Sequence, residues 1–373
     1  MTATSLEIRP AIDAHVVGRR KTGNETYVVN LATALARHAN VHPIAYLDAG
    51  VSWPQPDGPE TRELSWRSSF LRIPVELPTQ ARRDRCDLLH VQYVAPPIAR
   101  VPIVTAIHDV SFEDVPGLFP LRTEVRLKLT VRLSAWRSQT IITISQFTRG
   151  RIAHHYHIDP DLIVVTPLGV GNQWRPLARD DAVARLVALA LPTRFVLAVG
   201  NLHPRKNIPR LVRAVAAARE AGAGDLHLVL AGQPWWRTGE IDEAIEDAVA
   251  RRWVHFLGYV DDDTLVALYT CADVVAYPSL YEGFGLPVLE ALACGAVVVA
   301  SNTTAIPEVA GHAAILVDPL DVTEIAEAIA IASTDEQTRS SLRRAAPLQT
   351  ARFTWDRCAD LTVGAYRAAL GNR

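Results

Sequence analysis

The sequence lacks the charge pattern and the cysteine motifs that mark several common classes of protein. Its 38 lysine and arginine residues face 40 acidic residues, which gives a net charge of −2, so the basic excess that a nucleic-acid binder needs is missing. The four cysteines form no C-x-x-C pair. This spacing indicates neither a zinc knuckle nor a disulfide framework, and reduced thiols in the cytosol are the simplest interpretation.

Membrane-spanning and leader patterns are missing as well. No apolar run is long enough to cross a bilayer, and residues 1–10 place Glu7 and Arg9 where a signal peptide needs an apolar core. We therefore expect a cytoplasmic, soluble protein whose membrane contact is at most peripheral, at the inner face. The Walker pattern G-x-x-x-x-G-K-[ST] is absent, and no G-x-G-x-x-G follows a predicted strand, which disfavours a dinucleotide oxidoreductase.

What the sequence does contain predicts two α/β domains. A chain of 373 residues exceeds the size at which one core keeps growing, and an apolar content of 49% can fill two cores. From Arg194 onward, short apolar runs alternate with helical stretches, which is typical of a parallel sheet covered on both faces. We expect strands at 195–200, 226–232, 254–258, 274–279, 297–301 and 314–317, and helices at 208–221, 241–252, 263–271, 288–294 and 322–332.

The first half repeats this alternation less regularly. Residues 50–78 show no clear period and are predicted to be a long loop or insert. Glycine and proline in 168–176 indicate a hinge, so we expect domains at 1–172 and 173–350, and a C-terminal segment, 351–373, whose helix packs back on the first domain. The expected strands are 6–13, 44–48, 88–91, 103–108, 141–145 and 163–166, with a helix at 25–37 and the C-terminal helix at 353–370.

The most informative segment is Glu282-Gly-Phe-Gly-Leu-Pro-Val-Leu-Glu290, which places two carboxylates around a glycine-rich turn. Pro287 suits the first position of a helix, so Glu282 falls in the preceding loop and Glu290 about one turn inside the helix. The glycines let backbone approach a ligand, and the free N–H groups of the helix start attract an anion such as phosphate. Because carboxylates bind hydroxyl groups, the segment suits a sugar nucleotide. An acidic loop before a surface helix is the alternative.

Cations follow another strand of the same predicted sheet. The run Asn201-Leu-His-Pro-Arg205-Lys206-Asn207 comes directly after strand 195–200, and ligands bind beyond the carboxyl ends of such strands. Arg205 can bind a diphosphate bidentately and Lys206 can act as a compact charge. Taken alone, the pair is more often a solvated helix start.

In the first half, His108 and Asp109 stand where strand 103–108 ends. Either side chain could orient a substrate hydroxyl, and capping of the strand end and of the next turn is an equally good interpretation. The early loop 18–24, which contains Gly23, could present backbone N–H groups to a phosphate, although a tight turn explains it as well.

Two further patterns have plain interpretations. Residues 121–137 alternate basic and apolar side chains in an amphipathic helix, which by default is solvated, with a lipid headgroup or an anionic acceptor as the alternative ligand of this face. His154-His155-Tyr156-His157 point in different directions on a helix and cannot converge on one metal ion, so we interpret them as surface residues.

Together these motifs resemble the family-4 retaining glycosyltransferases, and the similarity extends over nearly the whole chain. Segment 282–290 looks like the E-x7-E element of that family, 200–207 looks like its donor-diphosphate loop, and His108-Asp109 and Ile144-Ser145 are similar to two marks of its acceptor-side domain. The resemblance implies two Rossmann-like doubly wound domains facing across a cleft, the GT-B architecture, with the acceptor bound by the first domain and the sugar nucleotide by the second.

The resemblance also implies a role for individual residues. The implied catalytic residues are Glu282, His108, Arg205 and Lys206, and Asp109 would lie on the acceptor side. The implied donor-binding residues are Gly23, Gly200, Asn201, Arg205, Lys206, Tyr259, Val260, Glu282, Gly283, Phe284, Gly285, Leu286 and Glu290. The family requires neither a metal nor another cofactor, so none is expected here.

The implied activity is transfer of a hexose from a nucleotide-diphosphate sugar to a saccharide or lipid-linked acceptor, with retention of configuration. GDP-mannose is slightly favoured as the donor, and a UDP-hexose is possible. One alternative is a sugar-nucleotide epimerase or phosphorylase on a similar scaffold, for which no proton-shuttling pair or lysine-held cofactor stands out. The other is a noncatalytic sugar-nucleotide binding protein, which the joint presence of Glu282, Arg205, Lys206 and His108 disfavours.

Overall fold

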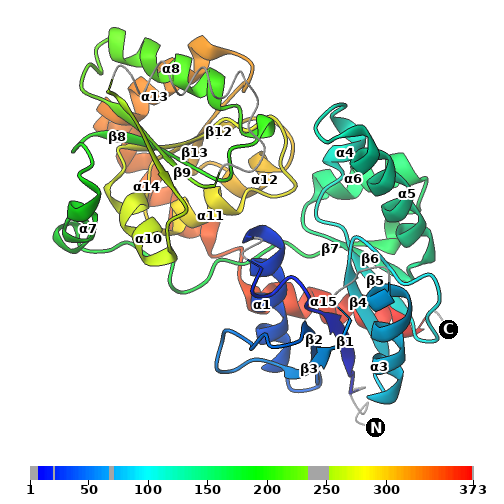
Figure 1. The fold of residues 1–373 in the computed structure, drawn as a ribbon. Helices are drawn as coiled ribbons and strands as arrows, with labels where there is room; N and C mark the ends of the chain where they lie inside the picture. Colours follow the sequence, from blue (N-terminus) through cyan, green and yellow to red (C-terminus); the bar gives the residue numbers. More distant parts are fainter. Residues whose placement is uncertain (1–6, 20–21, 67–70, 234–251, 372–373) are drawn as a thin grey trace. The chain divides into compact units, whose positions relative to one another are not determined.

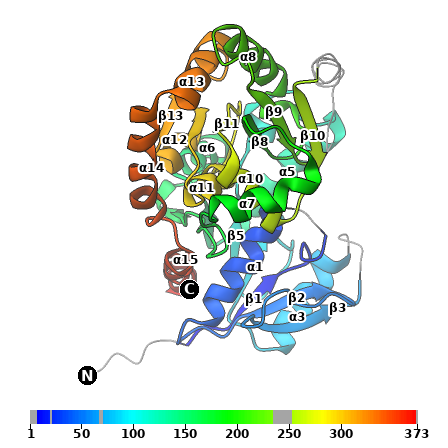
Figure 2. The same ribbon diagram turned by 90° about the vertical axis from the view of Figure 1, so that its left-hand side faces the viewer.

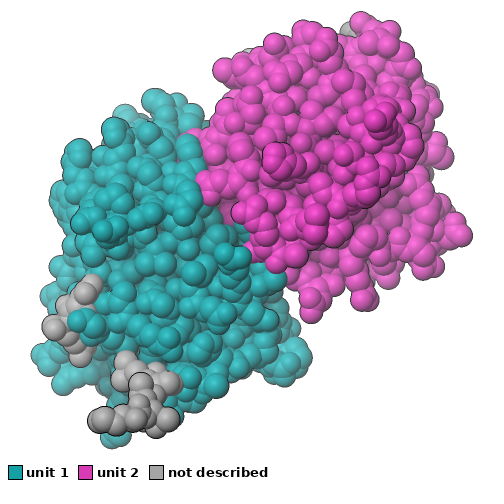
Figure 3. Space-filling view, turned by 180° about the vertical axis from the view of Figure 1, so that it is seen from behind, with its two compact units in different colours: residues 1–169, 353–373 teal, residues 170–352 magenta. Residues whose placement is uncertain are grey.

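The computed structural model describes residues 7–19, 22–66, 71–233 and 252–371. The chain forms two compact units, unit 1 from residues 1–169 and 353–373, and unit 2 from residues 170–352, which Figure 3 colours teal and magenta. These divisions lie three residues before the boundary expected after 172 and two residues after the boundary expected after 350. Each unit has its own sheet with helices on both faces (Figures 1 and 2).

The sheet of unit 2 is entirely parallel, with the strand order β10-β9-β8-β11-β12-β13. The order reverses between β8 and β11, so the loops that follow these two strands flank a topological switch point, where open α/β sheets bind ligands. Every strand end lies within two residues of its predicted position. The strands are β8 Phe195–Val199, β9 His227–Ala231, β10 Val254–Gly258, β11 Val274–Tyr277, β12 Val298–Ser301 and β13 Ala314–Val317.

Helices cover both faces of this sheet. On one face, α8 (Ile208–Glu220) and α13 (Val322–Thr334) pack against each other and against alternate strand residues in a single apolar core. Figure 1 shows α10 (Asp262–Cys271) and α11 (Leu286–Ala293) on the opposite face. The expected helix 241–252 lies almost entirely outside the described residues. The remaining described elements are α7 Arg179–Leu186, η3 Val187–Leu189, η4 Pro204–Lys206, α12 Ile306–Ala310 and α14 Glu336–Thr350.

Unit 1 repeats this plan with the strand order β3-β2-β1-β4-β5-β6-β7, again all parallel. Its switch point lies between β1 and β4. Both units are therefore doubly wound α/β units, as the sequence predicted. The strands are β1 Pro10–Asp13, β2 Ile44–Asp48, β3 Glu60–Leu64, β4 Leu88–Gln92, β5 Ile103–Ala106, β6 Thr140–Thr143 and β7 Ile163–Val165.

The C-terminal helix α15 (Trp355–Gly371) belongs to unit 1, although unit 2 separates it from the rest of that unit in the sequence. It packs against α1 (Thr22–Ala36) and lies on β5, β6 and β7. The other described helices of unit 1 are η1 Arg72–Glu76, α3 Leu77–Arg83, α4 Ser111–Asp114, α5 Leu121–Arg137, α6 Gln146–Tyr156 and η2 Pro160–Leu162. None of the described helices combines the length and apolar content needed to cross a bilayer.

The prediction of a long loop at 50–78 was wrong. The segment contains β3, which pairs with β2 in the register Ile44↔Glu60, and the π-helical turn η1. Four of the five β3 residues are exposed, because this strand lies at the edge of the sheet, so the apolar alternation that marks a half-buried strand is missing. The Arg72 side chain of η1 is 2% exposed, which no local pattern indicates.

Candidate functional site

The cation-bearing loop of unit 2 leaves β8 and is fixed by an asparagine. Asn207 has φ 60° at the start of α8, and its Nδ2 donates to the carbonyl oxygens of Pro278 at 3.0 Å and Pro319 at 2.6 Å. The backbone N–H of Leu280 donates to the carbonyl of Arg205 at 2.7 Å. These bonds tie the loop after β8 to the loop after β11, the two loops that flank the switch point.

Lys206 and Glu282 meet at this position. The Lys206 Nζ lies 2.7 Å from Glu282 Oε1, and it also donates to the Tyr277 hydroxyl and sits 4.3 Å from the centre of the Tyr277 ring. Arg205 Nη1 approaches Glu282 Oε2 at 3.5 Å. The structure thus brings together three of the predicted site residues, two cations and one carboxylate.

The charges of this cluster determine its protonation. Glu282 is 6% exposed, and burial alone would raise its pKa, but the charges of Lys206 and Arg205 outweigh burial and hold the pKa at about 2. Burial lowers the pKa of Lys206, against the opposing effect of Glu282. Arg205 remains partly accessible, with 30% of its side chain exposed, so it is available to an anionic ligand.

The turn after Glu282 needs its last glycine. Gly285 has φ 107° at the N-cap of α11, and a Cβ there would lie 2.5 Å from Ile306 Cδ1, so a side chain would be strained and crowded at this position. The helix begins at Leu286, two residues before the predicted range 288–294, and Pro287 is its second residue rather than its first. Phe284 is buried and Gly283 lies in the same turn.

Glu290 differs electrostatically from Glu282. It lies in the second turn of α11 and is 7% exposed, and the Tyr269 hydroxyl donates to its Oε2 at 3.3 Å. Burial and the charge of Asp262 raise the pKa of Glu290 to about 8. At neutral pH this side chain is therefore largely a carboxylic acid in the structure as described, rather than the carboxylate that we expected to hold hydroxyl groups.

The remaining donor-side residues lie along the same sheet edge. Gly200 follows β8 directly, and the Asn201 Oδ1 accepts from the backbone N–H of Gln233 at 3.4 Å. Gly200, Lys206, Tyr277 and Ser279 line a small pocket between the two loops. Tyr259 and Val260 follow β10, two strands from β8, and Tyr259 is 51% exposed.

In unit 1, His108 is buried two residues after β5 ends. Its Nε2 lies 3.3 Å from Gln92 Oε1, and its ring meets the Tyr27 ring edge-on at 4.4 Å between centres. Burial lowers the pKa of His108 to about 3, so the imidazole is neutral. Because an amide oxygen only accepts, Nε2 carries the proton in this assignment and Nδ1 is the acceptor.

Two other predicted positions of unit 1 have local structural roles. The Asp109 Oδ1 accepts from the backbone N–H and hydroxyl of Ser111 at 3.0 and 2.8 Å, which is the capping interpretation. Gly23 lies in the first turn of α1, not in a loop, because that helix begins at Thr22, three residues earlier than expected.

Sequence reasoning missed a polar cluster near His108. Asp13 ends β1 and pairs with His15, and His90 accepts from or donates to two hydroxyls, those of Tyr27 at 3.1 Å and Tyr366 at 2.7 Å. The sequence could have indicated Asp13 as a site residue, because it ends a predicted strand just as His108 does. Tyr366 carries no such signal, since 276 residues separate it from His90.

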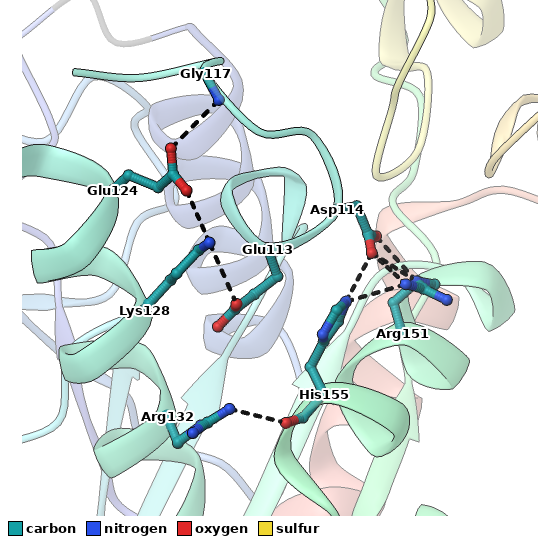
Figure 4. A network of polar contacts seen from close by, with 8 residues as sticks. All are labelled: Glu113, Asp114, Gly117, Glu124, Lys128, Arg132, Arg151 and His155. Carbon is teal, nitrogen blue, oxygen red and sulfur yellow. Dashed lines mark hydrogen bonds and ion pairs between the residues drawn. The ribbon is translucent and has the colours of Figure 1, made fainter. Parts of the chain in front are cut away.

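A second missed network ties α4 to α5 and α6 (Figure 4). Arg151 Nε binds both carboxylate oxygens of Asp114 at 2.9 Å, and His155 Nε2 lies 2.7 Å from Asp114 Oδ1. Lys128 Nζ of α5 binds Glu124 of the same helix at 2.7 Å and lies 4.0 Å from Glu113 Oε2 of α4. The prediction that residues 154–157 lie at the surface was therefore wrong for two of them: Tyr156 is 1% exposed, and His155 is only partly exposed and pairs with Asp114.

Known proteins match both halves of the chain. Residues 187–349 match the family model described as "Glycosyl transferases group 1", and residues 22–173 match that of "Glycosyltransferase Family 4". The O-antigen chain mannosyltransferase B of Escherichia coli is 32% identical over 71% of this chain and 70% of its own length. The E. coli serotype-specific mannosyltransferase WbdA is 32% identical over 63% of this chain, but the match spans only 29% of WbdA.

Solved structures share the fold at low sequence identity. Anabaena HepE in complex with UDP-glucose superposes with a TM-score of 0.77 at 19% identity, covering 97% of this chain and 100% of that one. Sucrose-phosphate synthase of Thermosynechococcus elongatus gives 0.76 at 20% identity over 98% and 100% of the two chains. These likenesses identify the GT-B fold.

Proposed function

The chain belongs to the group 1 glycosyltransferases, and from this membership we propose that it transfers a hexose from a nucleotide-diphosphate sugar to a saccharide or lipid-linked acceptor with retention of configuration. The observation that carries the proposal is the cluster of Arg205, Lys206 and Glu282 at the switch point of unit 2. A diphosphate needs the cations, and a sugar needs a carboxylate that accepts from hydroxyl groups. The cluster supplies both.

The proposed reaction breaks the bond between the anomeric carbon and the β-phosphate oxygen, and forms the bond to the acceptor hydroxyl on the same face. The acceptor proton goes to the departing phosphate. Lys206 and Arg205 stabilise the charge that grows on the leaving group, and loss of one such group costs about 3 kcal/mol of barrier. Glu282, ionised because of these cations, accepts from the hydroxyls of the donor sugar.

We assign the donor as GDP-mannose, with a UDP-hexose as the competing donor. The support is that several relatives at about one-third identity are named as mannosyltransferases. We also propose that no metal or other cofactor takes part, since Arg205 and Lys206 would supply the positive charge that a diphosphate needs.

The test compares GDP-mannose, UDP-glucose and NAD in a thermal-shift assay with EDTA present, followed by nucleotide release and the anomeric configuration of the product by NMR. Selective stabilisation by GDP-mannose and an α-linked product support the proposal. An epimerised sugar nucleotide, a sugar 1-phosphate, or binding without turnover would instead identify an epimerase, a phosphorylase or a binding protein.

Lys206 provides the sharper test of the diphosphate assignment. In Lys206→Ala, the affinity for GDP should fall by about ten- to hundred-fold while that for guanosine changes little, because only GDP contacts the cation. Arg213→Ala, which removes an exposed cation from the middle of α8, is the control. Equal weakening of GDP and guanosine would contradict the assignment.

We further propose that helix α5 contacts an anionic lipid surface, where a lipid-linked acceptor resides. The α5 apolar stripe, defined as Leu121, Val125, Leu129, Leu133 and Trp136, is 47–76% exposed. Arg122 and Arg126 stand between its members and Arg137 follows the last one, and these three arginines form no ion pair within the part of the chain that the structure describes. Exposed apolar side chains flanked by unpaired cations are the pattern of an interfacial helix.

Sedimentation with vesicles tests this surface. Vesicles of phosphatidylglycerol should bind the protein, whereas phosphatidylcholine vesicles should not, and Leu129→Ser combined with Leu133→Ser should abolish binding. Leu348→Ser, at a leucine of unit 2 that is 77% exposed, is the matched control. A dimer that dissociates in the double variant, with no vesicle binding by the parent protein, would show that α5 binds a second copy instead.

A further inference from the structure

The pair Asp13–His15 occupies a position in unit 1 that the proposed reaction has not yet used. Asp13 is the last residue of β1, and His15 lies in the turn that follows. The strand order of unit 1 reverses between β1 and β4, so the loop after β1 borders the switch point, where ligands bind in sheets of this kind. This is the counterpart in unit 1 of the Lys206 loop in unit 2.

The geometry of the pair orients the histidine. Asp13 Oδ1 lies 2.9 Å from His15 Nδ1 and also accepts from the backbone N–H of His15 at 3.3 Å. Asp13 is 2% exposed. Burial would raise the pKa of this carboxyl, but the neighbouring His15 and Arg72 outweigh burial and lower it, so Asp13 is an anion that only accepts hydrogen bonds. His15 Nδ1 therefore carries a proton, and Nε2 points away from the carboxylate.

Nε2 is left available for a ligand. The side chain of His15 is 18% exposed, and within residues 7–19, 22–66, 71–233 and 252–371 its Nε2 has no hydrogen-bond partner. A histidine that merely neutralised Asp13 would not need an accessible second nitrogen. The buried cation Arg72 already contributes to that neutralisation, since its charge lowers the pKa of Asp13.

The pair also belongs to the same edge as His108. In the register of β1 with β4, Ile12 pairs with His90, and Tyr27 touches both His90 and His108. The loops after β1 and β5 therefore lie on either side of β4 at one edge of the sheet. A sugar bound there would meet neutral hydrogen-bonding groups, in contrast to the cations of unit 2.

We propose that His15 binds a hydroxyl group of the acceptor sugar through Nε2, and that Asp13 is the positioning residue that fixes the ring. This inference rests on the proposed function, since it takes the acceptor to be a saccharide. The group bound is the hydroxyl of a neutral sugar. The imidazole accepts a hydrogen bond from this hydroxyl or donates one to it, according to the protonation of the ring.

The experiment uses the full chain, GDP-mannose and methyl α-mannoside as the acceptor probe, and it separates transfer from donor hydrolysis. In the transfer reaction, the kcat/KM of His15→Ala for the glycoside should be about ten- to hundred-fold lower than that of the parent protein, because a hydrogen bond to an oriented side chain is lost. GDP released without acceptor should stay unchanged, since the proposed diphosphate cluster of Arg205, Lys206 and Glu282 is in unit 2. His42→Ala, at an exposed histidine preceding β2, is the control. His15→Gln, which keeps a side-chain hydrogen-bonding group, should recover part of the activity.

A second readout does not require turnover. In the NMR spectrum of protein labelled at histidine, the ring signal that is absent from His15→Ala belongs to His15. This signal should shift when methyl α-mannoside is added. A kcat/KM for the glycoside within two-fold of the parent, a parallel loss of donor hydrolysis, or an unmoved His15 signal would each overturn the proposal. Failure of the proposed function is distinct, because the parent protein would then release no GDP from GDP-mannose while the His15 signal still reports sugar binding.

Discussion

The two units place different chemistry at equivalent points of the same topology. In unit 2 the switch point carries charged side chains that neutralise one another, with Lys206 and Arg205 on Glu282. In unit 1 the corresponding edge carries His108 and His90, whose buried imidazoles are neutral, beside the single ion pair of Asp13. A repeated strand order therefore provides two adjacent loops at an edge, and the side chains of those loops decide which ligand the edge suits.

The largest expected effect comes from breaking the charged edge of unit 2. Glu282→Gln should lower the rate of transfer by about a thousand-fold, because the donor sugar loses its carboxylate and Lys206 loses its counter-charge. The circular dichroism spectrum should stay native. Glu327→Gln, at an exposed glutamate of α13, is the control. Near-normal turnover in Glu282→Gln would remove this residue from the site.

The pH dependence of stability tests the electrostatics of the site in unit 2. The pKa of Glu290 is about 8 in the folded protein, against an ordinary value of 4.5, so the folded state binds an extra proton between these values. The contribution of Glu290 to the free energy of unfolding is then present below pH 4.5 and declines as pH rises to about 8, by several kcal/mol at about 1.4 kcal/mol per pKa unit. Urea unfolding across this range should show a decline that Glu290→Gln flattens. A decline of the same size in the variant would contradict the assignment.

Unit 1 should show the opposite slope. Burial lowers the pKa of His108 from 6.5 to about 3, so the unfolded state binds the extra proton between these values and stability rises with pH from about 3 to about 6.5. We expect His108→Gln to remove part of this rise, on the order of 1–3 kcal/mol, since side-chain relaxation offsets some of the burial effect. Unfolding by urea at pH 4.5 and pH 7 measures it. His42→Gln should leave the difference between the two pH values unchanged.

The smallest expected effect concerns the attachment of α15 to unit 1. Tyr366→Phe removes the hydroxyl that lies 2.7 Å from His90 Nδ1 in the buried interior, which should destabilise the protein by about 1–3 kcal/mol. Arg37→Ala breaks an exposed ion pair with Asp356 between α1 and α15 and should cost under about 1 kcal/mol. The denaturant concentrations at the unfolding midpoints of the two variants compare these losses of stability. Equal losses would mean that the buried hydrogen bond contributes no more than the exposed pair.

Periodicity and strand-end position predicted much of the fold, and the residues that form the charged cluster of unit 2. The strands of unit 2 are mostly apolar, so each is easily recognised, and Arg205, Lys206 and Glu282 lie in the loops that follow two of them. Strand β3 was not predicted, because an exposed edge strand has no apolar pattern. The raised pKa of Glu290 could not be predicted, because it depends on burial and on Asp262, which stands 28 positions earlier in the chain.

Local sequence also could not reveal contacts that span the chain. His155 pairs with Asp114 across 41 residues, and Tyr366 reaches His90 across 276, so no window of sequence contains both partners. The Asp13–His15 pair was within reach, since both residues lie at the end of a predicted strand. The pair carries no pattern of its own, because an aspartate and a histidine two positions apart are also common in ordinary turns.

The placement of α15 has a consequence for biosynthesis. Because α15 covers β5, β6 and β7 and its Tyr366 completes a buried bond with His90, the ribosome must translate all of unit 2 before unit 1 can close its interior. Unit 2 is continuous in sequence and can fold as soon as it emerges. Until α15 emerges, the nascent N-terminal half exposes the apolar surface of β5, β6 and β7 that this helix covers.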